Sequence, residues 1–114
     1  PVPADEFPPK CDACGGIIRP DVVLFGEMLP RQALRDAGHL ATTADVFLSI
    51  GTSVLVQPAA SLPFAALQAD AIVVEINPSP TDLTPVAHHS VRAPAGIALP
   101  KIWRRMTALL NGRP

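Results

Sequence analysis

Residues 45–53 read DVFLSIGTS, and residues 71–78 read AIVVEINP. Each stretch holds a short, mostly apolar run rich in Val and Ile, which is typical of a buried β-strand. The first run ends at Gly51 and the second at Asn77-Pro78, and both are turn signals. The two stretches therefore predict strands over residues 45–50 and 71–76, each followed by polar residues at its carboxyl end.

Helical patterns surround these two strands. Ser61 is the expected N-cap of the middle helix, and Pro63 lies in its first turn, where a missing N–H costs little. Asn111-Gly112 supplies C-terminal cap chemistry to the last helix. The expected helices span residues 31–44, 61–68 and 98–110. Strands that alternate with helices predict an α/β fold with a parallel sheet.

The same patterns predict the structure of two further segments. Residues 21–25, DVVLF, form an apolar run that ends at Gly26 and predicts a buried strand or extended segment. Residues 82–94 are expected to form a loop with one short strand. The apolar stripe of the last helix, which includes Trp103 and Met106, is expected to be helix packing.

Composition excludes several classes of protein. The chain has 114 residues, a net charge of −1 and 48% hydrophobic residues, which suits one compact domain. It has no basic block, so nucleic acid is not an expected partner. It has no run of 18 apolar residues and no visible signal peptide, so no membrane partner is expected. Only two cysteines are present, which favours a reducing, cytoplasmic setting.

The strand ends carry the first candidate site. Ligands bind beyond the carboxyl ends of strands in open parallel sheets. Gly51 allows close backbone approach, Thr52 and Ser53 add hydroxyl donors, and Asn77 can both donate to and accept from a ribose diol. These residues suggest a nucleotide-binding edge. The alternative is that both are ordinary turns, since two common phosphate-binding fingerprints are absent.

The cysteines carry the second candidate site. Cys11 and Cys14 form a CxxC pair followed by Gly15-Gly16, which suits a metal knuckle. A redox CxxC would more often precede a helix, which the two glycines discourage, so metal is favoured over redox chemistry. A structural zinc site needs four ligands, and this pair supplies only two.

Together these motifs resemble the sirtuins, which are NAD-dependent protein-lysine deacylases. The resemblance rests on ordered pieces across about residues 8–110: CDACGG at 11–16, RPDVVLFGE at 19–27 with Leu29-Pro30, GTS at 51–53 with QPA at 57–59, INP at 76–78 and APAG at 93–96. It implies the C-terminal half of a Rossmann-like parallel sheet with helices over residues 21–114. Part of a small zinc-binding module would precede it over residues 1–20.

The resemblance also implies roles for individual residues. NAD, the co-substrate, would be held by Gly51, Thr52, Ser53, Asn77, Pro78, Ser79 and Ala95. The acyl-lysine peptide would pair with Val23, Leu24, Phe25 and Gly26 as an added strand. Cys11 and Cys14 would be ligands of a structural Zn²⁺ ion. The family's first CxxC pair, its Gly-Ala-Gly loop and its catalytic histidine are expected upstream of this chain, so no catalytic residue is assigned within it.

Several alternatives stay open. Val23 to Phe25 could be core, and Glu27 could cap or pair locally. His39 is expected on a helix surface, and the adjacent His88 and His89 are expected in a loop with no ligand role. The chain could be a non-catalytic NAD- and zinc-binding module of the same family, or a CxxC redox protein. The missing N-terminal part, or a second copy of the chain, is the expected partner that completes the sheet and the zinc site.

Overall fold

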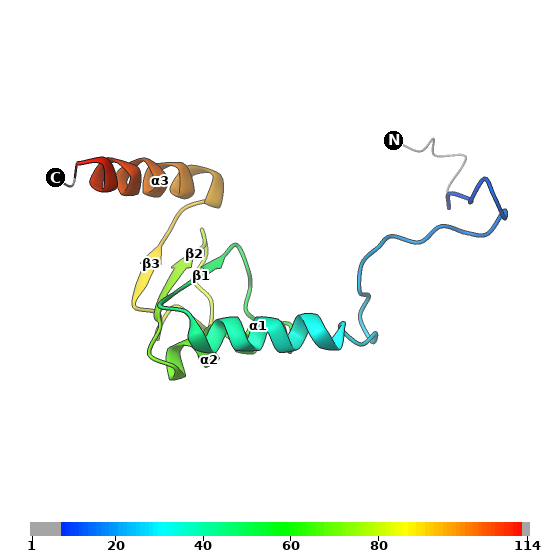
Figure 1. Ribbon diagram of the computed structural model, residues 1–114, viewed down its shortest axis with the longest axis horizontal. Helices are drawn as coiled ribbons and strands as arrows, with labels where there is room; N and C mark the ends of the chain where they lie inside the picture. Colours follow the sequence, from blue (N-terminus) through cyan, green and yellow to red (C-terminus); the bar gives the residue numbers. More distant parts are fainter. Residues whose placement is uncertain (1–7, 113–114) are drawn as a thin grey trace. The chain divides into compact units, whose positions relative to one another are not determined.

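In the computed structural model, three parallel strands form a sheet in the order β1–β2–β3 (Figure 1). The strands span Val46–Ile50, Ile72–Ile76 and His89–Val91. Val46 pairs with Ile72 and Ile50 with Ile76, so β1 and β2 run in register over their whole length. The two strands predicted from their apolar runs, and the parallel sheet, are therefore confirmed.

The structure describes residues 8–112, which divide into two units between Arg31 and Gln32. The longer unit contains the sheet and its helices, and the shorter unit contains the cysteine pair. The predicted boundary at residue 20 remains a prediction. None of the described helices is long and apolar enough to cross a membrane.

The helices confirm most of the sequence pattern. α1 spans Arg31–Thr43, the short η2 spans Ala59–Ser61, α2 spans Leu62–Gln68 and α3 spans Ala95–Asn111. Pro63 lies in the first turn of α2, as expected. Gly112 is the C-cap residue of α3, and its N–H donates to Ala108 O at 3.1 Å.

Ser61 occupies the N-cap position of α2, as predicted, whereas α3 starts earlier than predicted. The Ser61 side chain makes no cap hydrogen bond, because its Oγ donates to the Pro58 carbonyl at 2.7 Å and the preceding η2 turn already leads into α2. α3 begins at Ala95 rather than at residue 98, because Pro94 is extended at φ −58°, ψ 142° and the helix starts directly after it.

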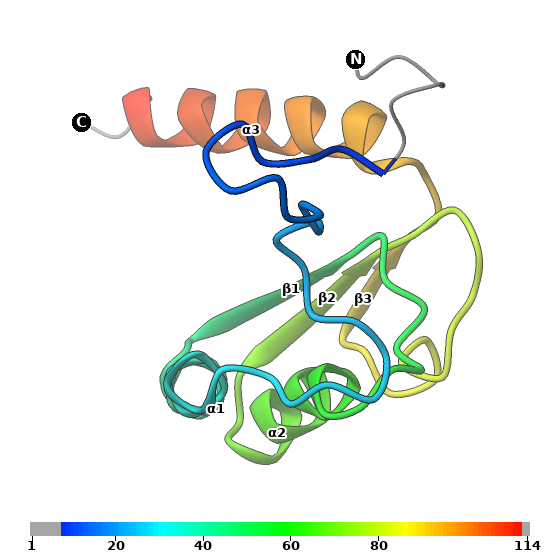
Figure 2. The same cartoon turned by 90° about the vertical axis from the view of Figure 1, so that its right-hand side faces the viewer.

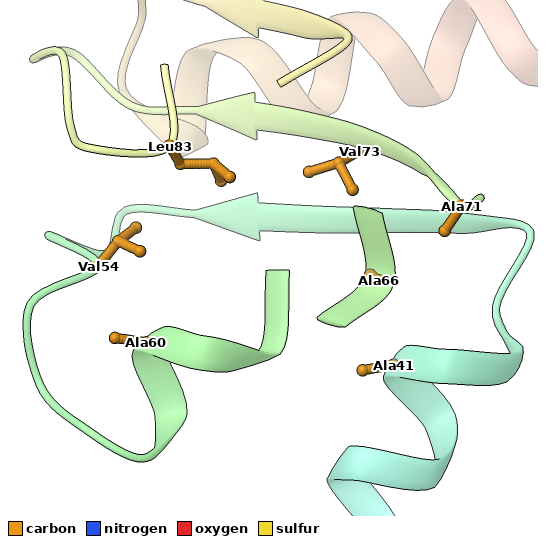
Figure 3. Close-up of a cluster of buried hydrophobic side chains, with 7 residues drawn as sticks. All are labelled: Ala41, Val54, Ala60, Ala66, Ala71, Val73 and Leu83. Atoms are coloured by element: carbon orange, nitrogen blue, oxygen red, sulfur yellow. The ribbon is translucent and has the colours of Figure 1, made fainter. Parts of the chain in front are cut away.

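One face of the sheet carries the core. Figure 2 shows α1 and α2 on the same side of the strands. Small side chains from both helices pack against β2 and the loops that follow β1 and β2 (Figure 3), and the cluster comprises Ala41, Val54, Ala60, Ala66, Ala71, Val73 and Leu83. The residues of β1 that alternate with Phe47 and Ser49 lie on the other face, where Val46 and Leu48 are about half exposed. The helices therefore anchor the loops at the carboxyl ends of the strands as well as the strands themselves.

The shorter unit contains no strand among its described residues, apart from a single antiparallel bridge between Lys10 and Ile17. Of the two options predicted for residues 21–25, the buried strand is therefore wrong and the extended segment remains a prediction. The alternative that Val23 to Phe25 are core is also wrong, because all three are exposed. Phe25 is 92% exposed. An apolar run becomes a strand only when a neighbouring strand satisfies its backbone, and here residues 24–27 close a tight turn instead.

Candidate functional site

Two loops at the carboxyl ends of β1 and β2 enclose a cleft of about 430 Å³. The loop after β1 contributes Gly51, Ser53 and Leu55, and the loop after β2 contributes Asn77, Ser79, Pro80, Thr81 and Asp82. None of the described residues that line the cleft is a lysine or an arginine. Its polar groups are hydroxyls, a carboxamide and a carboxylate, which suit the hydroxyls of a sugar better than they would clamp a bare phosphate.

The loop after β1 is shaped by two residues with positive φ. Gly51 has φ +63°, and its N–H donates to Ile76 O at 2.9 Å, which ties the first loop to the end of the neighbouring strand. Val54 has φ +59°, which is uncommon for a β-branched residue, and its side chain is buried in the core. Its N–H donates to Thr52 Oγ1 at 3.2 Å. Core packing of Val54 thus holds the loop in a strained shape beside the cleft.

Asn77 joins the two loops across the cleft wall. Its Nδ2 donates to Thr52 O at 2.8 Å, and its Oδ1 accepts from the Ser79 N–H at 3.1 Å. The residue is 9% exposed. The side-chain amide therefore uses one N–H and one lone pair in hydrogen bonds to the protein, and one further N–H and one lone pair are left for a ligand.

Behind the second loop lies a buried carboxylate, Glu75 on β2, which is 1% exposed. Glu75 Oε2 accepts from Arg92 at 2.7 Å, from Thr84 Oγ1 at 2.8 Å and from Ser90 Oγ at 3.3 Å. Glu75 Oε1 accepts from Thr81 Oγ1. Burial raises the pKa of Glu75, but the hydrogen bonds from Thr81, Thr84 and Arg92 outweigh it, so the pKa lies below its ordinary value.

The structure brings together most of the predicted NAD-binding residues. Gly51, Ser53, Asn77 and Ser79 line the cleft. Thr52 lines a smaller neighbouring cleft of about 110 Å³, which it shares with Ser53. Pro78 and Ala95 line neither of these clefts among the described residues, and their assignment to NAD remains a prediction.

Sequence reasoning missed the other half of the site. Leu55, Pro80, Thr81 and Asp82 line the cleft, and the ion pair between Glu75 and Arg92 supports it. A signal was present, because a glutamate within the apolar strand AIVVEI must be paired if it is buried. The sequence could not indicate which of nine basic residues pairs with it.

In the shorter unit, the predicted peptide-binding segment lies on a loop that an exposed ion pair organises. Arg19 donates from Nη1 and Nη2 to both carboxylate oxygens of Glu27, at 2.7 and 3.0 Å. Glu27 also accepts from the Leu24 N–H at 3.0 Å, and Gly26 has φ +88° at the tip of the turn. The guanidinium of Arg19, followed by the Leu24 N–H, lowers the pKa of Glu27. The prediction that Glu27 pairs locally is confirmed.

The cysteine pair forms a tight knuckle. Cys11 N–H donates to Gly16 O and Gly15 N–H donates to Cys11 O, both at 2.8 Å, and Gly15 has φ +70°. Backbone hydrogen bonds from Cys14 and Ala13, and one from the Cys14 side chain, lower the pKa of Cys11, which favours the thiolate form that binds metals. Both cysteines are free thiols. The donor set fits half of a tetrahedral zinc site, and the described residues hold no group of three possible ligands.

None of the three histidines lines the cleft. His39 lies exposed on α1, as predicted. His88 Nδ1 accepts from the Val73 N–H at 3.1 Å, which gives it a structural role at the edge of β2. His89 belongs to β3, the short strand predicted within residues 82–94, rather than to the surrounding loop. On α3, Trp103 and Met106 are 66% and 49% exposed, so the packing expected for them is not found among the described residues.

Comparison with known proteins finds one consistent likeness. The family model "Sir2 family" matches residues 2–58. The "NAD-dependent protein deacylase 2" of Pyrobaculum aerophilum is 47% identical over 97% of this chain and 45% of that protein. The "NAD-dependent protein deacylase" of Mycobacterium tuberculosis is 50% identical over 97% of this chain and 47% of that protein. The chain therefore spans less than half the length of these relatives.

Solved structures show the same likeness. An ADP-ribose complex of a Sir2 homologue mutant is 43% identical, with a TM-score of 0.88, and the match covers 99% of this chain and 45% of that one. A Sir2 protein bound to a propionylated peptide is 31% identical, with a TM-score of 0.77, over 87% of this chain and 42% of that one. The fold of the chain is thus the Rossmann-like α/β fold of these proteins.

Proposed function

The chain belongs to the Sir2 family, the sirtuins, and on that premise we propose that it forms part of an NAD-dependent protein-lysine deacylase. The observation that carries the proposal is the cleft of about 430 Å³, which unites Gly51 and Ser53 with Asn77 and Ser79 at the carboxyl ends of two parallel strands. Dinucleotides bind at this edge in open α/β sheets. The ADP-ribose complex of a similar protein supports the same ligand class.

The cleft residues hold the ADP-ribose part of NAD. The backbone turn at Gly51 allows close approach of the phosphates, because glycine has no Cβ to block them. Ser53 and Ser79 provide hydroxyls, and the remaining N–H and lone pair of Asn77 form hydrogen bonds with the ribose of the adenosine. Because no described lysine or arginine lines the cleft, phosphate charge is met by backbone N–H groups and by segments of the complete enzyme.

The reaction transfers acyl groups from lysine to ADP-ribose. The acyl oxygen of the lysine attacks the activated ribose carbon of NAD as nicotinamide leaves. A ribose hydroxyl then attacks the former acyl carbon, and one water is consumed as the bond from that carbon to the lysine nitrogen breaks, so the products are free lysine, nicotinamide and O-acyl-ADP-ribose. The general base is a histidine that the chain does not supply, and the cleft of this chain binds and orients the nucleotide. The peptide lies along Val23, Leu24, Phe25 and Gly26. Relatives named as deacylases and a complex with a propionylated peptide support this assignment.

The cysteine knuckle binds a structural Zn²⁺ ion. Cys11 and Cys14 supply two thiolates, and the other two ligands come from the preceding part of the complete protein or from a second copy of the chain. The metal would tie the shorter unit together and take no part in acyl transfer. The glycines of the knuckle support this role, because they let the backbone turn tightly around the thiolates.

Isothermal titration calorimetry of NAD into the purified 114-residue chain, with zinc present, tests the nucleotide site. Binding is expected, and Ser53→Ala or Asn77→Ala should weaken it. Thr43→Ala on α1 is the control. A chain that is folded by circular dichroism but takes up no NAD would overturn the proposed site. An NAD-binding protein that releases no nicotinamide in the presence of an acyl-lysine peptide would instead support the non-catalytic alternative.

A further inference from the structure

The central strand of the sheet carries a charge that the NAD-binding residues do not explain. Glu75 lies on β2 between two other strands, in register with Ser49 on β1 and Ser90 on β3, and is 1% exposed. Burying a carboxylate costs several kcal/mol unless it is paired and hydrogen-bonded. Four side chains satisfy it here, and no buried side-chain polar atom among the described residues lacks a partner.

The partner of this carboxylate, Arg92, follows directly after β3 and reaches the loop after β2. Arg92 Nη2 donates to Glu75 Oε2 and to Thr84 Oγ1, both at 2.7 Å. Arg92 Nη1 donates to two backbone carbonyls, Asn77 O at 3.2 Å and Ser79 O at 3.1 Å. Both terminal nitrogens of the Arg92 guanidinium therefore form hydrogen bonds within the protein, and Arg92 does not line the cleft.

The same network fixes the rest of the loop through two hydroxyls. Thr81 Oγ1 and Thr84 Oγ1 each donate to the Glu75 carboxylate. In return, Thr81 Oγ1 accepts from the Leu83 N–H at 3.1 Å, and Thr84 Oγ1 accepts from the Thr81 N–H at 2.8 Å. The carboxylate thus sets which way each hydroxyl proton points, and the hydroxyls in turn hold the backbone.

We propose that Arg92 is a positioning residue of the nucleotide cleft, which acts through Glu75 and the Asn77 and Ser79 carbonyls. Three cleft residues, Asn77, Ser79 and Thr81, touch Arg92 or Glu75 directly. A loop that is held in its binding shape before the ligand arrives saves the entropy of ordering it on binding. The inference rests on the proposed function, because it names what shapes the same cleft.

The first test replaces Arg92 by lysine and measures binding of ADP-ribose by calorimetry. Lysine keeps the charge but cannot form the planar fork that reaches the carboxylate and both carbonyls. The dissociation constant of Arg92→Lys should rise about ten-fold or more, since several hydrogen bonds to a charged group are lost. Arg35→Lys, on an exposed arginine of α1 that hydrogen-bonds to Gln32, is the matched control and should bind as the wild type does.

A second readout reports on the loop itself. Hydrogen–deuterium exchange of three amides, Ser79, Thr81 and Leu83, should accelerate in Arg92→Lys without ligand, while exchange in β1 stays at wild-type rates. A purely structural role would instead raise exchange throughout the sheet. Equal acceleration in β1 and in the loop, or no change in the loop, overturns the positioning role.

A variant at Thr84 guards against a folding defect in Arg92→Lys. Thr84→Val keeps the shape but removes the hydroxyl that bonds Arg92, Glu75 and the Thr81 N–H, so it should weaken ADP-ribose binding in the same way. Thr84→Ser restores the hydroxyl and should restore binding. A wild-type chain that does not bind ADP-ribose overturns the proposed function together with this role. Wild-type binding that Arg92→Lys and Thr84→Val leave unchanged overturns the positioning role alone.

Discussion

Arg92 and Glu75 form an ion pair of 2.7 Å in which the Glu75 side chain is 1% exposed and the Arg92 side chain is 34% exposed. The two residues are 17 positions apart in the sequence. Glu75 belongs to the central strand, β2, and Arg92 directly follows β3. Removal of one partner from such a pair leaves an uncompensated charge, which costs more than the pair itself contributes. The pair therefore links the stability of the sheet to the shape of the cleft that lies beside it.

The first prediction concerns the pH dependence of stability. The hydrogen-bonded carboxylate of Glu75 has a folded-state pKa below its unfolded value, which is about 4.3. Its contribution is therefore complete above the unfolded pKa and is lost as the pH falls through the folded pKa. Urea unfolding between pH 7 and pH 3 should show this loss of free energy of unfolding.

The variant Glu75→Gln should remove that part of the pH dependence. At pH 7 it should lower the free energy of unfolding by about 1–3 kcal/mol, because the charge-assisted hydrogen bonds weaken. Asp45→Asn, on an exposed carboxylate just before β1, is the control. The prediction would be contradicted if the free energy of unfolding fell by the same amount between pH 7 and pH 3 in the wild type and in Glu75→Gln.

The second prediction concerns the left-handed glycine at the cleft. Gly51→Ala should destabilise the chain by about 1–2 kcal/mol, since φ +63° is unfavourable for a residue with a Cβ, although the space around that Cβ is open. Gly38→Ala in α1 is the matched control, because its Cβ also meets open space and alanine favours a helix. It should stabilise by up to about 1 kcal/mol. Equal midpoints of thermal unfolding for Gly51→Ala and Gly38→Ala would contradict the left-handed conformation of Gly51.

The third prediction concerns the anchor of the second loop. Leu83 is fully buried in the core cluster, and its neighbour Val86 is 51% exposed. Leu83→Ala should lower the free energy of unfolding by about 2–5 kcal/mol, whereas Val86→Ala should change it by less than about 0.5 kcal/mol. Because Leu83 belongs to the loop that borders the cleft, Leu83→Ala should also weaken NAD binding. Unchanged stability of Leu83→Ala in urea would contradict the packing.

The sequence predicted the parts of the fold that local patterns determine. Apolar runs located β1 and β2, and the glycine and asparagine after them located half of the cleft. It could not predict the ion pair that supports the cleft, because Glu75 and Arg92 lie side by side only when β3 is placed next to β2 in the sheet. It also wrongly predicted a buried strand as one option for residues 21–25, since an apolar run does not reveal whether a neighbouring strand is there to accept its hydrogen bonds.

The periodicity of α3 shows the same limit. A stripe that includes Trp103 and Met106 predicts a packed helix face, but it does not say which segment covers that face. The apolar residues on the second face of the sheet, Val46, Leu48 and Ile72, pose the same question. Parallel sheets are normally covered on both faces, so we expect these residues to pack against the remainder of the complete protein or a second copy.

The fourth prediction concerns the peptide-binding loop. Phe25 is 92% exposed, so Phe25→Ala should leave the free energy of unfolding unchanged. If Phe25 borders the acyl-lysine, the variant should raise KM for an acyl-lysine peptide about ten-fold, because an aromatic contact is lost on binding. The assay uses the protein that carries this chain and follows release of nicotinamide. Leu40→Ala, on an exposed leucine of α1, is the control. A wild-type KM in Phe25→Ala would remove Phe25 from the peptide site.

The last prediction concerns zinc and the purified 114-residue chain. Cys11 and Cys14 supply two thiolates from a preformed knuckle, and a structural zinc ion takes four ligands. Two copies of the chain can pool four cysteines, so added zinc should convert monomers to dimers with about one metal per two chains. Light scattering measures the mass, and metal analysis of the dimer peak measures the stoichiometry.

Chelation should return the dimer to monomers, because metal binding and ligand assembly are coupled. Cys14→Ser should abolish the response to zinc, since a hydroxyl does not replace a thiolate ligand. Ser61→Ala, which changes a hydroxyl on η2 far along the chain from the knuckle, is the control and should dimerise as the wild type does. Dimers that form without zinc would show that the chains associate without the metal, and the open sheet would then be the expected interface. Monomers at saturating zinc would mean that the remaining two ligands must come from another part of the complete protein.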